Sequence, residues 1–475
     1  MVYAMVLFPL FMAGIAAAIP MNRVRPWLLP FSAVIHFSLT VLVLVSPELA
    51  HETGWFVLDP VGKVILLVVD TLVLFSSFYA VGYLMQRLER SNRFFIAGIL
   101  GFLGLTSVVT WSHHLGVTWV AIEGTTLVTA PLIYFNRTKT SIEATWRYLL
   151  VGSVGIALAL LGTFFLAYAL LRQGITPSLL LEDLVPLSPE LSKPWLRAAF
   201  ILLLIGFGTK MGLAPMHTWK PDAYGEAPAV VGAILAGGVT SCAFLAFLRV
   251  YQICLAAGEG AFASRILLYM GLFSMAVAGL FMVGQRDFKR LLAYSSVEHM
   301  GILIFGLGVG APALFGTLLH VMMNALTKGV LFLSAGNIHR AYNSRNIGQV
   351  HGAFRRLPVS GILFFLGFLA ITASPPFGPF VSIFAIVTGA FDAGKTPGAV
   401  LFLLFLLLVF FGMGRTVLAV TLGESPSRES QYRDTFLTAA PIILVMALVL
   451  ALGLYLPTPL TELLQEAVSF MEKWS

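Results

Sequence analysis

Apolar segments long enough to cross a membrane follow one another along the whole chain, and this pattern constrains the fold most strongly. Most are about 18–25 residues long, enough for a helix to span the ~30 Å hydrocarbon core of a bilayer. With 58% hydrophobic and 11% charged residues, the chain is not an ordinary soluble domain. Because lipid cannot satisfy backbone hydrogen bonds, each segment is expected to be helical. The sequence therefore predicts an all-α, polytopic membrane protein.

We expect about fourteen transmembrane helices. Their predicted boundaries are 2–19, 27–46, 56–85, 94–112, 115–135, 146–171, 198–219, 227–256, 265–284, 291–309, 311–337, 359–391, 398–421 and 435–456. The spaces between them are too short for a soluble domain.

Lysine and arginine are unevenly distributed between alternate loops. The richer group of loops includes Arg23, Arg87, Arg137, Arg290 and Arg345. The positive-inside rule places this group in the cytoplasm, and an even number of spans then places both termini on the outer side. The basic residues are scattered over short loops, so the net charge of +7 reflects topology and does not indicate nucleic-acid binding.

Motifs for bound cofactors are missing from the sequence. Its two cysteines, Cys242 and Cys254, form no CxxC pair, and no His/Cys cluster has metal-ligand spacing. This argues against iron–sulfur, nickel–iron and structural zinc sites within the chain. Phosphate-binding glycine loops are also missing, which argues against ATP and dinucleotides. No catalytic centre, metal site or cofactor site is expected here, so any redox chemistry belongs to a partner.

One lysine lies in the middle of an apolar stretch at 200–219. A lysine at mid-bilayer depth costs roughly 2.5–3.5 kcal/mol, so Lys210 is expected to have a partner and a function. Gly208, Gly212 and Pro215 are expected to break the helix around it. Transporters place their ion sites at such broken helices. The sequence therefore indicates movement of protons or cations.

A carboxylate with a similar position is Glu123, near the centre of the segment 115–135. Two interpretations are open for Glu123 and Lys210. They form either a structural ion pair between two helices or a pair that controls a proton site.

His320, Asn324 and Lys328 are spaced four residues apart, so they share one face of a helix. Such a polar stripe orders a water chain through the bundle or has a structural role. Glu298 and His299, early in another span, lie either at the cytoplasmic mouth of a pathway or near the lipid headgroups.

Three further charged residues have structural interpretations. Asp70 and Lys63 are seven residues apart on one predicted span, which favours a structural pair or a contact with a partner. Arg249 lies near the end of a span and is expected to reach out to polar groups.

A second interrupted helix is predicted at Pro375, Pro376 and Gly378. It lies five spans after the Lys210 segment, and an odd separation gives the two breaks opposite topology. We therefore expect two inverted five-helix repeats, each with a broken helix. The predicted units are an N-terminal three-helix region at 1–93, repeats at 94–256 and 265–421, and a C-terminal helix with a short tail at 435–475.

Two sequence runs also carry a family resemblance. Residues 208–223 read Gly-Thr-Lys-Met-Gly-Leu-Ala-Pro-Met-His-Thr-Trp-Lys-Pro-Asp-Ala. This run resembles the antiporter-like membrane subunits of complex I, Mrp-type antiporters and membrane-bound hydrogenases. The run at 288–301, Phe-Lys-Arg-Leu-Leu-Ala-Tyr-Ser-Ser-Val-Glu-His-Met-Gly, most resembles the hydrogenase-4 and formate hydrogenlyase branch.

The resemblance implies a fourteen-helix subunit of a larger complex in the cytoplasmic (inner) membrane of a prokaryote. It implies that Glu123 pairs with Lys210, and that His320 and Lys328 continue a hydrated axis. The implied partners are other membrane subunits and a peripheral redox arm. Iron–sulfur clusters, and a nickel–iron centre or a quinone, are expected in those partners.

This chain departs from the family pattern at several positions. Relatives often carry a lysine or histidine near Ala236 or Ser241, a histidine at position 324, and a lysine or glutamate near Ile383. Three functions therefore remain open. They are a proton- or cation-translocating subunit of a redox-driven complex, a structural or coupling subunit with a degraded ion pathway, and a subunit of a gradient-driven cation/proton antiporter or uptake system.

Overall fold

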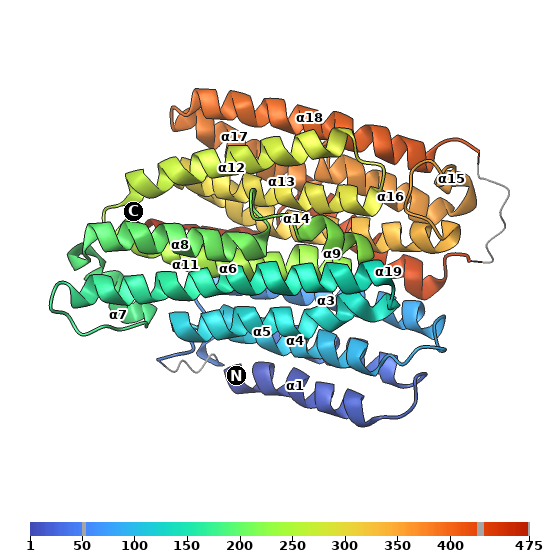
Figure 1. The fold of residues 1–475 in the computed structure, drawn as a ribbon, viewed down its shortest axis with the longest axis horizontal. Helices are drawn as coiled ribbons and strands as arrows, with labels where there is room; N and C mark the ends of the chain where they lie inside the picture. The colour runs from blue at the N-terminus through green and yellow to red at the C-terminus, as the bar shows by residue number, and fades with distance from the viewer. Residues whose placement is uncertain (50–53, 425–431, 474–475) are drawn as a thin grey trace.

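The computed structural model describes residues 1–49, 54–424 and 432–473. Within these residues the chain forms helices and no β-strand, which confirms the predicted all-α fold. Most of the helices run side by side along the long axis of the molecule (Figure 1). The short helix α7 (Leu181–Leu187) lies at one end of this bundle and α15 (Ala353–Arg356) at the other.

The first half of the chain contains α1 (Val2–Ala18), α2 (Leu28–Val45), α3 (Pro60–Met85), α4 (Arg93–Trp111), α5 (Leu115–Ile133), α6 (Lys139–Leu171), α8 (Lys193–Met211), α9 (Lys220–Glu226), α10 (Ala229–Ala233), the π-helix η5 (Ile234–Val239) and α11 (Thr240–Ala256). The second half contains α12 (Gly260–Val283), α13 (Phe288–Val309), α14 (Ala311–Tyr342), α16 (Pro358–Ile371), α17 (Gly378–Asp392), α18 (Thr396–Thr421), α19 (Phe436–Leu454) and α20 (Thr458–Glu472). Short 3₁₀ turns η1 to η4 lie at Arg25–Trp27, Pro47–Leu49, Tyr134–Asn136 and Ser188–Glu190.

Among the described residues, twelve helical segments are long and apolar enough to cross a membrane. Three shorter apolar helices, α1, α16 and α17, accompany them. The polytopic architecture is therefore confirmed. The count of fourteen stays a prediction, because it requires α1 to cross and α16 with α17 to form one interrupted crossing.

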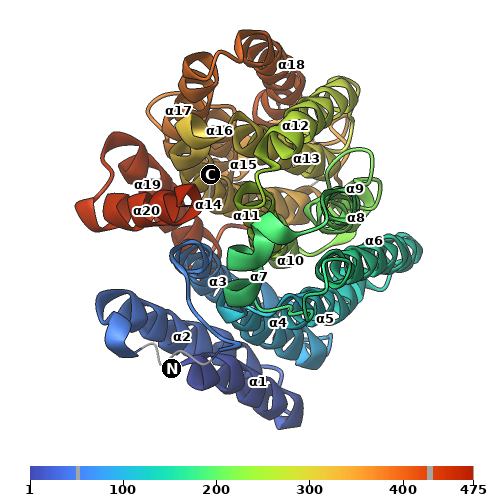
Figure 2. The ribbon, with the colours of Figure 1, turned by 90° about the vertical axis from the view of Figure 1, so that its left-hand side faces the viewer.

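Three of these segments form the centre of the bundle. The most apolar windows of α13, of α14 and of the continuous segment α10–η5–α11 are entirely buried within the protein. Figure 2 shows α14, α10 and α11 surrounded by the other helices, with α1 and α2 at one edge and α18 at the opposite edge. Polar side chains on the central helices therefore face protein, not lipid.

The first break follows Lys210 directly. Helix α8 ends at Met211, and Gly212 adopts φ +76°, a left-handed conformation that suits glycine. A Cβ at Gly212 would lie 2.5 Å from Cδ of Lys220, so this position also requires the small side chain. Pro215 lies in the connection, as predicted, whereas Gly208 lies inside α8, so the helix continues past it.

The second break separates α16 from α17. Pro375 and Pro376 lie in the connection, and Gly378 is the first residue of α17. Both interrupted segments therefore exist in the structure. The two inverted repeats, and the predicted unit boundaries, stay predictions.

The predicted short tail contains a further helix. Helix α20 places Leu464, Ala467 and Met471 against the protein and packs on α3 and α14. It lies across the end of the bundle that Figure 2 presents to the viewer. The sequence carried a signal for this helix, because Leu460, Leu464, Ala467 and Met471 recur at helical spacing. Residues 474–475 of the predicted C-terminal unit lie outside the described part.

Substitution of Gly212 tests the first break. Gly212→Ala combines a strained left-handed backbone with the contact to Lys220, so we expect a loss of stability of roughly 2 kcal/mol or more. Gly174→Ala is the matched control, since Gly174 is also left-handed at φ +73° but has no atom within 4 Å of its Cβ position. It should cost about 1 kcal/mol. Equal thermal unfolding shifts for both variants would contradict close packing at Gly212.

Candidate functional site

Lys210 and Glu123 form an ion pair between two helices. Nζ of Lys210, near the end of α8, lies 3.2 Å from Oε2 of Glu123 on α5. The lysine side chain is 1% exposed and the glutamate 19%. The two residues that were expected to meet do meet, at the helix break.

Small and polar residues of α5 and α6 build the surroundings of the pair. Lys210 also donates to the hydroxyl of Thr126, and Ser153 donates to Oε1 of Glu123 at 2.7 Å. Gly152 provides the space, because a Cβ there would lie 3.0 Å from Nζ of Lys210. The ammonium group lies 5.8 Å from the centre of the Tyr148 ring. The cation thus has a carboxylate, a hydroxyl and an aromatic face as partners.

A second polar group lies deep in α13 and α14. Nδ1 of His299 lies 2.9 Å from Nε2 of His320, and Nδ1 of His320 lies 2.9 Å from Oγ of Ser382 on α17. Lys328 donates to Oγ of Ser295 at 2.6 Å. His299, His320 and Ser382 thus link α13, α14 and α17, and Lys328 with Ser295 forms a separate contact between α13 and α14. We call these five residues the polar row.

Glu298 and His299 lie in the protein interior, at 0% exposure, and not at a mouth or near headgroups. Both were expected near a membrane surface, but α13 lies at the centre of the bundle and surrounds them with other helices. Within the described residues, both carboxylate oxygens of Glu298 and both side-chain polar atoms of Asn324 have no hydrogen-bond partner. Buried polar groups are normally paired with protein or water, so these atoms mark a place suited to water.

Lys220 is a buried lysine that the sequence did not reveal. It follows the helix break in the sequence, yet it is 0% exposed and donates to the carbonyls of Met211 at 2.5 Å and Ser296 at 3.3 Å. It also interacts electrostatically with Lys328. Lys220 therefore connects the end of α8, beside Lys210, with the polar row on α13. Its position after a helix break was the only available signal.

The polar row ends at Ser382. The next residue, Ile383, is buried in a cluster of apolar side chains from α12, α13, α14, α17 and α18. Members of this cluster include Met275, Phe305, Ile386 and Phe402. The expected lack of an ionisable group near Ile383 thus coincides with a closed apolar region.

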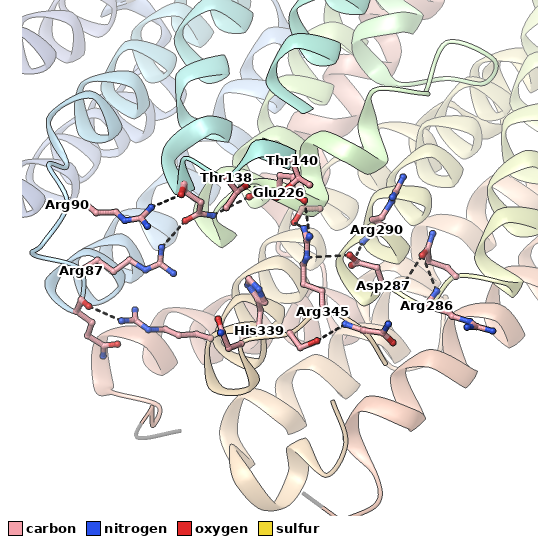
Figure 3. A pocket seen from close by; sticks show the side chains of 18 of the residues that line it. Arg87, Arg90, Thr138, Thr140, Glu226, Arg286, Asp287, Arg290, His339 and Arg345 are labelled. Atoms are coloured by element: carbon pink, nitrogen blue, oxygen red, sulfur yellow. Dashed lines mark hydrogen bonds and ion pairs between the residues drawn. The ribbon is translucent and has the colours of Figure 1, made fainter. Parts of the chain in front are cut away.

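The basic loops meet in one cavity of about 830 Å³. Its lining includes Arg87, Arg90, Arg286, Arg290, Arg340 and Arg345. Arg345 lies between Glu226, at 2.8 Å, and Asp287, at 3.4 Å (Figure 3). These loops were assigned to one side of the membrane from their charge, and the structure brings them together at one end of the bundle.

Arg249 does not reach out of the bundle as predicted. It is buried, lies 2.9 Å from Asp59 and donates to the carbonyls of Val109 and Ser112 at the end of α4. His113 also contacts Asp59, at 2.9 Å. Burial alone would raise the pKa of the Asp59 carboxyl, but Arg249, His113 and the Gly62 amide hold it below its ordinary value. This cluster joins α3 to α4 and α11.

Asp70 does not pair with Lys63 either. It faces His36 on α2, with Oδ2 2.9 Å from Nδ1. Lys63 instead lines a separate cavity with Glu462 and Glu466 of α20. The spacing of Asp70 and Lys63 along one helix predicted the wrong partner for Asp70, because His36 on the neighbouring helix α2 lies within hydrogen-bond distance of its carboxylate.

Among the residues in the described ranges, no group of three or more His, Cys, Asp or Glu side chains is placed to hold a metal ion.

Comparisons with known proteins define the class. Residues 112–412 match the family described as "NADH:quinone oxidoreductase/Mrp antiporter, TM". The chain is 33% identical to a hydrogenase-4 component F homolog of Methylacidiphilum infernorum, over 97% of this chain and 98% of that protein. It is 32% identical to NADH-quinone oxidoreductase subunit N of Desulforudis audaxviator, over 74% and 71% of the two chains.

A solved structure shares the fold. A chain of the Mrp complex from Dietzia sp. DQ12-45-1b superimposes with a TM-score of 0.88 at 20% identity, covering 99% of this chain and 97% of that one. The chain therefore belongs to the NADH:quinone oxidoreductase/Mrp antiporter transmembrane family. It is an antiporter-like membrane subunit, related to those of hydrogenase-4, complex I and Mrp assemblies.

Breaking the central pair tests its contribution to stability. Glu123→Gln leaves the Lys210 cation buried without its carboxylate, which should destabilise the protein by an amount toward the lower end of roughly 3–5 kcal/mol, because Glu123 is partly exposed. Glu143→Gln is the control, since Glu143 and its partner Arg147 are more than half exposed. Thermal unfolding of the purified complex measures both. Equal unfolding temperatures for Glu123→Gln and Glu143→Gln would show that the Lys210–Glu123 pair adds nothing to stability.

The Asp59 cluster predicts a pH dependence. A carboxyl whose pKa is lowered in the folded state stabilises the protein above its unfolded pKa of about 3.9, and this contribution is lost as the pH falls further. Asp59→Asn should therefore reduce stability above about pH 5, and the difference from wild type should shrink below about pH 4. Asp183→Asn is the control, because Asp183 is an exposed residue of the short helix α7. A stability difference between Asp59→Asn and wild type that stays constant with pH would contradict the lowered pKa of the Asp59 carboxyl.

Proposed function

We propose that this chain is a proton-translocating, antiporter-like subunit of a redox-driven membrane complex in the cytoplasmic (inner) membrane of a prokaryote. The observation that carries this proposal is the ion pair between Lys210 and Glu123 at a broken helix, 3.2 Å apart. A lysine at this depth is costly, and transporters place their ion sites where a helix is interrupted.

The energy required for translocation is within reach of such a pair. Moving one charge against ~150 mV requires ~3.5 kcal/mol. Breaking a buried ion pair changes the free energy by roughly 3–5 kcal/mol. A conformational change that separates Glu123 from Lys210 would therefore suffice to release a proton that the closed pair retains.

The interior polar residues supply a route away from the pair. Lys220 adjoins the end of α8, Glu298 and Lys328 interact electrostatically, and His299 and His320 lead to Ser382. The unpartnered atoms of Glu298 and Asn324 support a water chain between these groups. Asn324 hydrates this route and carries no charge.

Other subunits of the complex would cover the partly exposed Glu123 and provide the energy for translocation. Glu123 is partly exposed on the side of the bundle, beside the exposed Ser153, where a carboxylate would otherwise face lipid. A neighbouring membrane subunit that covers this surface would remove that cost. A peripheral redox arm with iron–sulfur clusters, and a nickel–iron centre or quinone, would provide the energy. The basic cavity would face the cytoplasm and both termini the outer side.

A second function is favoured by the region around Ile383. Since the polar row ends at an apolar cluster, the chain would act as a structural or coupling subunit if water did not pass this point. In that case Lys210 and Glu123 would hold helices together and transmit movement, without a complete proton path.

The test is proton movement in proteoliposomes that contain the whole purified complex. With Lys210→Ala, translocation through this chain should be lost while redox turnover continues, since no redox centre is expected here. Lys193→Ala is the control, because Lys193 is a largely exposed residue at the start of α8. Unchanged pumping and turnover in Lys210→Ala would reject translocation by this chain and favour the structural function.

A further inference from the structure

A second buried acid–base pair lies outside the site described above. His36 on α2 and Asp70 on α3 are 0% and 2% exposed. Nδ1 of His36 lies 2.9 Å from Oδ2 of Asp70, and Thr40 donates to the same oxygen. The other ring nitrogen, Nε2, lies 3.1 Å from the Met5 carbonyl and 2.9 Å from Oγ of Ser107. Four helices therefore meet around one imidazole ring.

The two hydrogen-bond partners of Nε2 show that this nitrogen carries a proton. The Met5 carbonyl only accepts hydrogen bonds, and Ser107 donates its own hydroxyl proton to the Leu103 carbonyl. Both neighbours thus accept from His36, so Nε2 carries a hydrogen. Nδ1 then faces a carboxylate oxygen at 2.9 Å, and two lone pairs at that distance would repel each other. One proton must lie between Nδ1 and Oδ2, on the ring or on the carboxyl group.

This proton count makes the pair electrically neutral. An imidazolium beside a carboxylate and a neutral ring beside a carboxylic acid have the same total charge. Loss of the shared proton would leave one negative charge in the interior of the bundle. The pair therefore has two states that differ by one proton and one charge.

The surroundings of Asp70 connect it with the central helices. Its second oxygen, Oδ1, has no hydrogen-bond partner within the part of the chain that the structure describes. Asp70 interacts electrostatically with the Cys242 thiol on α11, the titratable group facing it from that helix. Leu72, two residues after Asp70 and on a different face of α3, packs against Gly237 in the π-helix and against Gly329, which follows Lys328 on α14. A charge change at Asp70 thus occurs on a helix that contacts the polar row.

We propose that His36 and Asp70 form a proton-binding site in the N-terminal helices, separate from the Glu123–Lys210 pair, and that this site releases and rebinds one proton during turnover. The binding of the proton follows from the pair's own geometry. Its release during turnover rests on the proposed function. The alternative is a permanent clamp that holds α1, α2, α3 and α4 together and never changes its proton.

Infrared difference spectroscopy of the whole purified complex, with isotope-labelled histidine, tests the proposal. When the pH is varied, wild type should show a histidine band and a carboxyl band that change together, because the two groups share one proton. Asp70→Asn and His36→Gln should each lose both bands, whereas Lys210→Ala should keep them. Spectra of the two variants that equal the wild-type spectrum would overturn the proton-binding site and leave the permanent clamp.

Two further measurements cover the remaining outcomes. If Asp70→Asn and His36→Gln do not assemble, Thr40→Val keeps both members of the pair and removes one hydrogen bond to Oδ2. It should shift the titration midpoint by about one pH unit, and an unshifted midpoint would overturn the proposal. Reduction of wild type should produce the same bands at fixed pH. Their absence, with the pH-dependent bands present, would overturn the release during turnover and keep the binding site.

Discussion

The buried cation of Lys210 is the constraint on which the rest of the site depends. A charge at this depth is tolerated only with a counter-ion and hydrogen-bond partners, and the fold provides Glu123, Thr126 and the Tyr148 ring. Helix α8 ends at Met211, one residue after Lys210, and the chain turns at Gly212. The broken helix and the ion pair therefore lie side by side.

The two halves of the molecule differ in the ionisable residues near their broken helices. The first half combines a broken helix with an ion pair, and Lys220 continues the polar contacts toward the centre. In the second half the broken helix offers Ser382 to His320, and Ile383 beside it lies in an apolar cluster. The polar row on α13 and α14 therefore reaches α17 at the Ser382 hydroxyl and contacts no ionisable side chain there. Translocation would require water, or a neighbouring subunit, to complete the path.

The sequence predicted the features that follow from a local residue pattern or from the energetic cost of a charge in lipid. Apolar length revealed the helices, Gly212 and the prolines at 375 and 376 revealed the breaks, and the isolated charges revealed Lys210 and Glu123. The sequence did not predict features that depend on packing between distant segments of the chain. Lys220 resembled a loop residue, and its burial depends on how the chain turns back onto α8. The partner of Asp70 lies 34 positions away on another helix, so spacing could not identify His36.

The most direct test of the central claim is a double-mutant cycle on protons translocated per electron, with Glu123→Gln, Lys210→Met and both together in the whole complex. If the two residues act as one unit, each single variant should lose as much translocation as the double variant. Losses that add independently would contradict this account, because Glu123 and Lys210 would then serve separate steps or separate structural contacts.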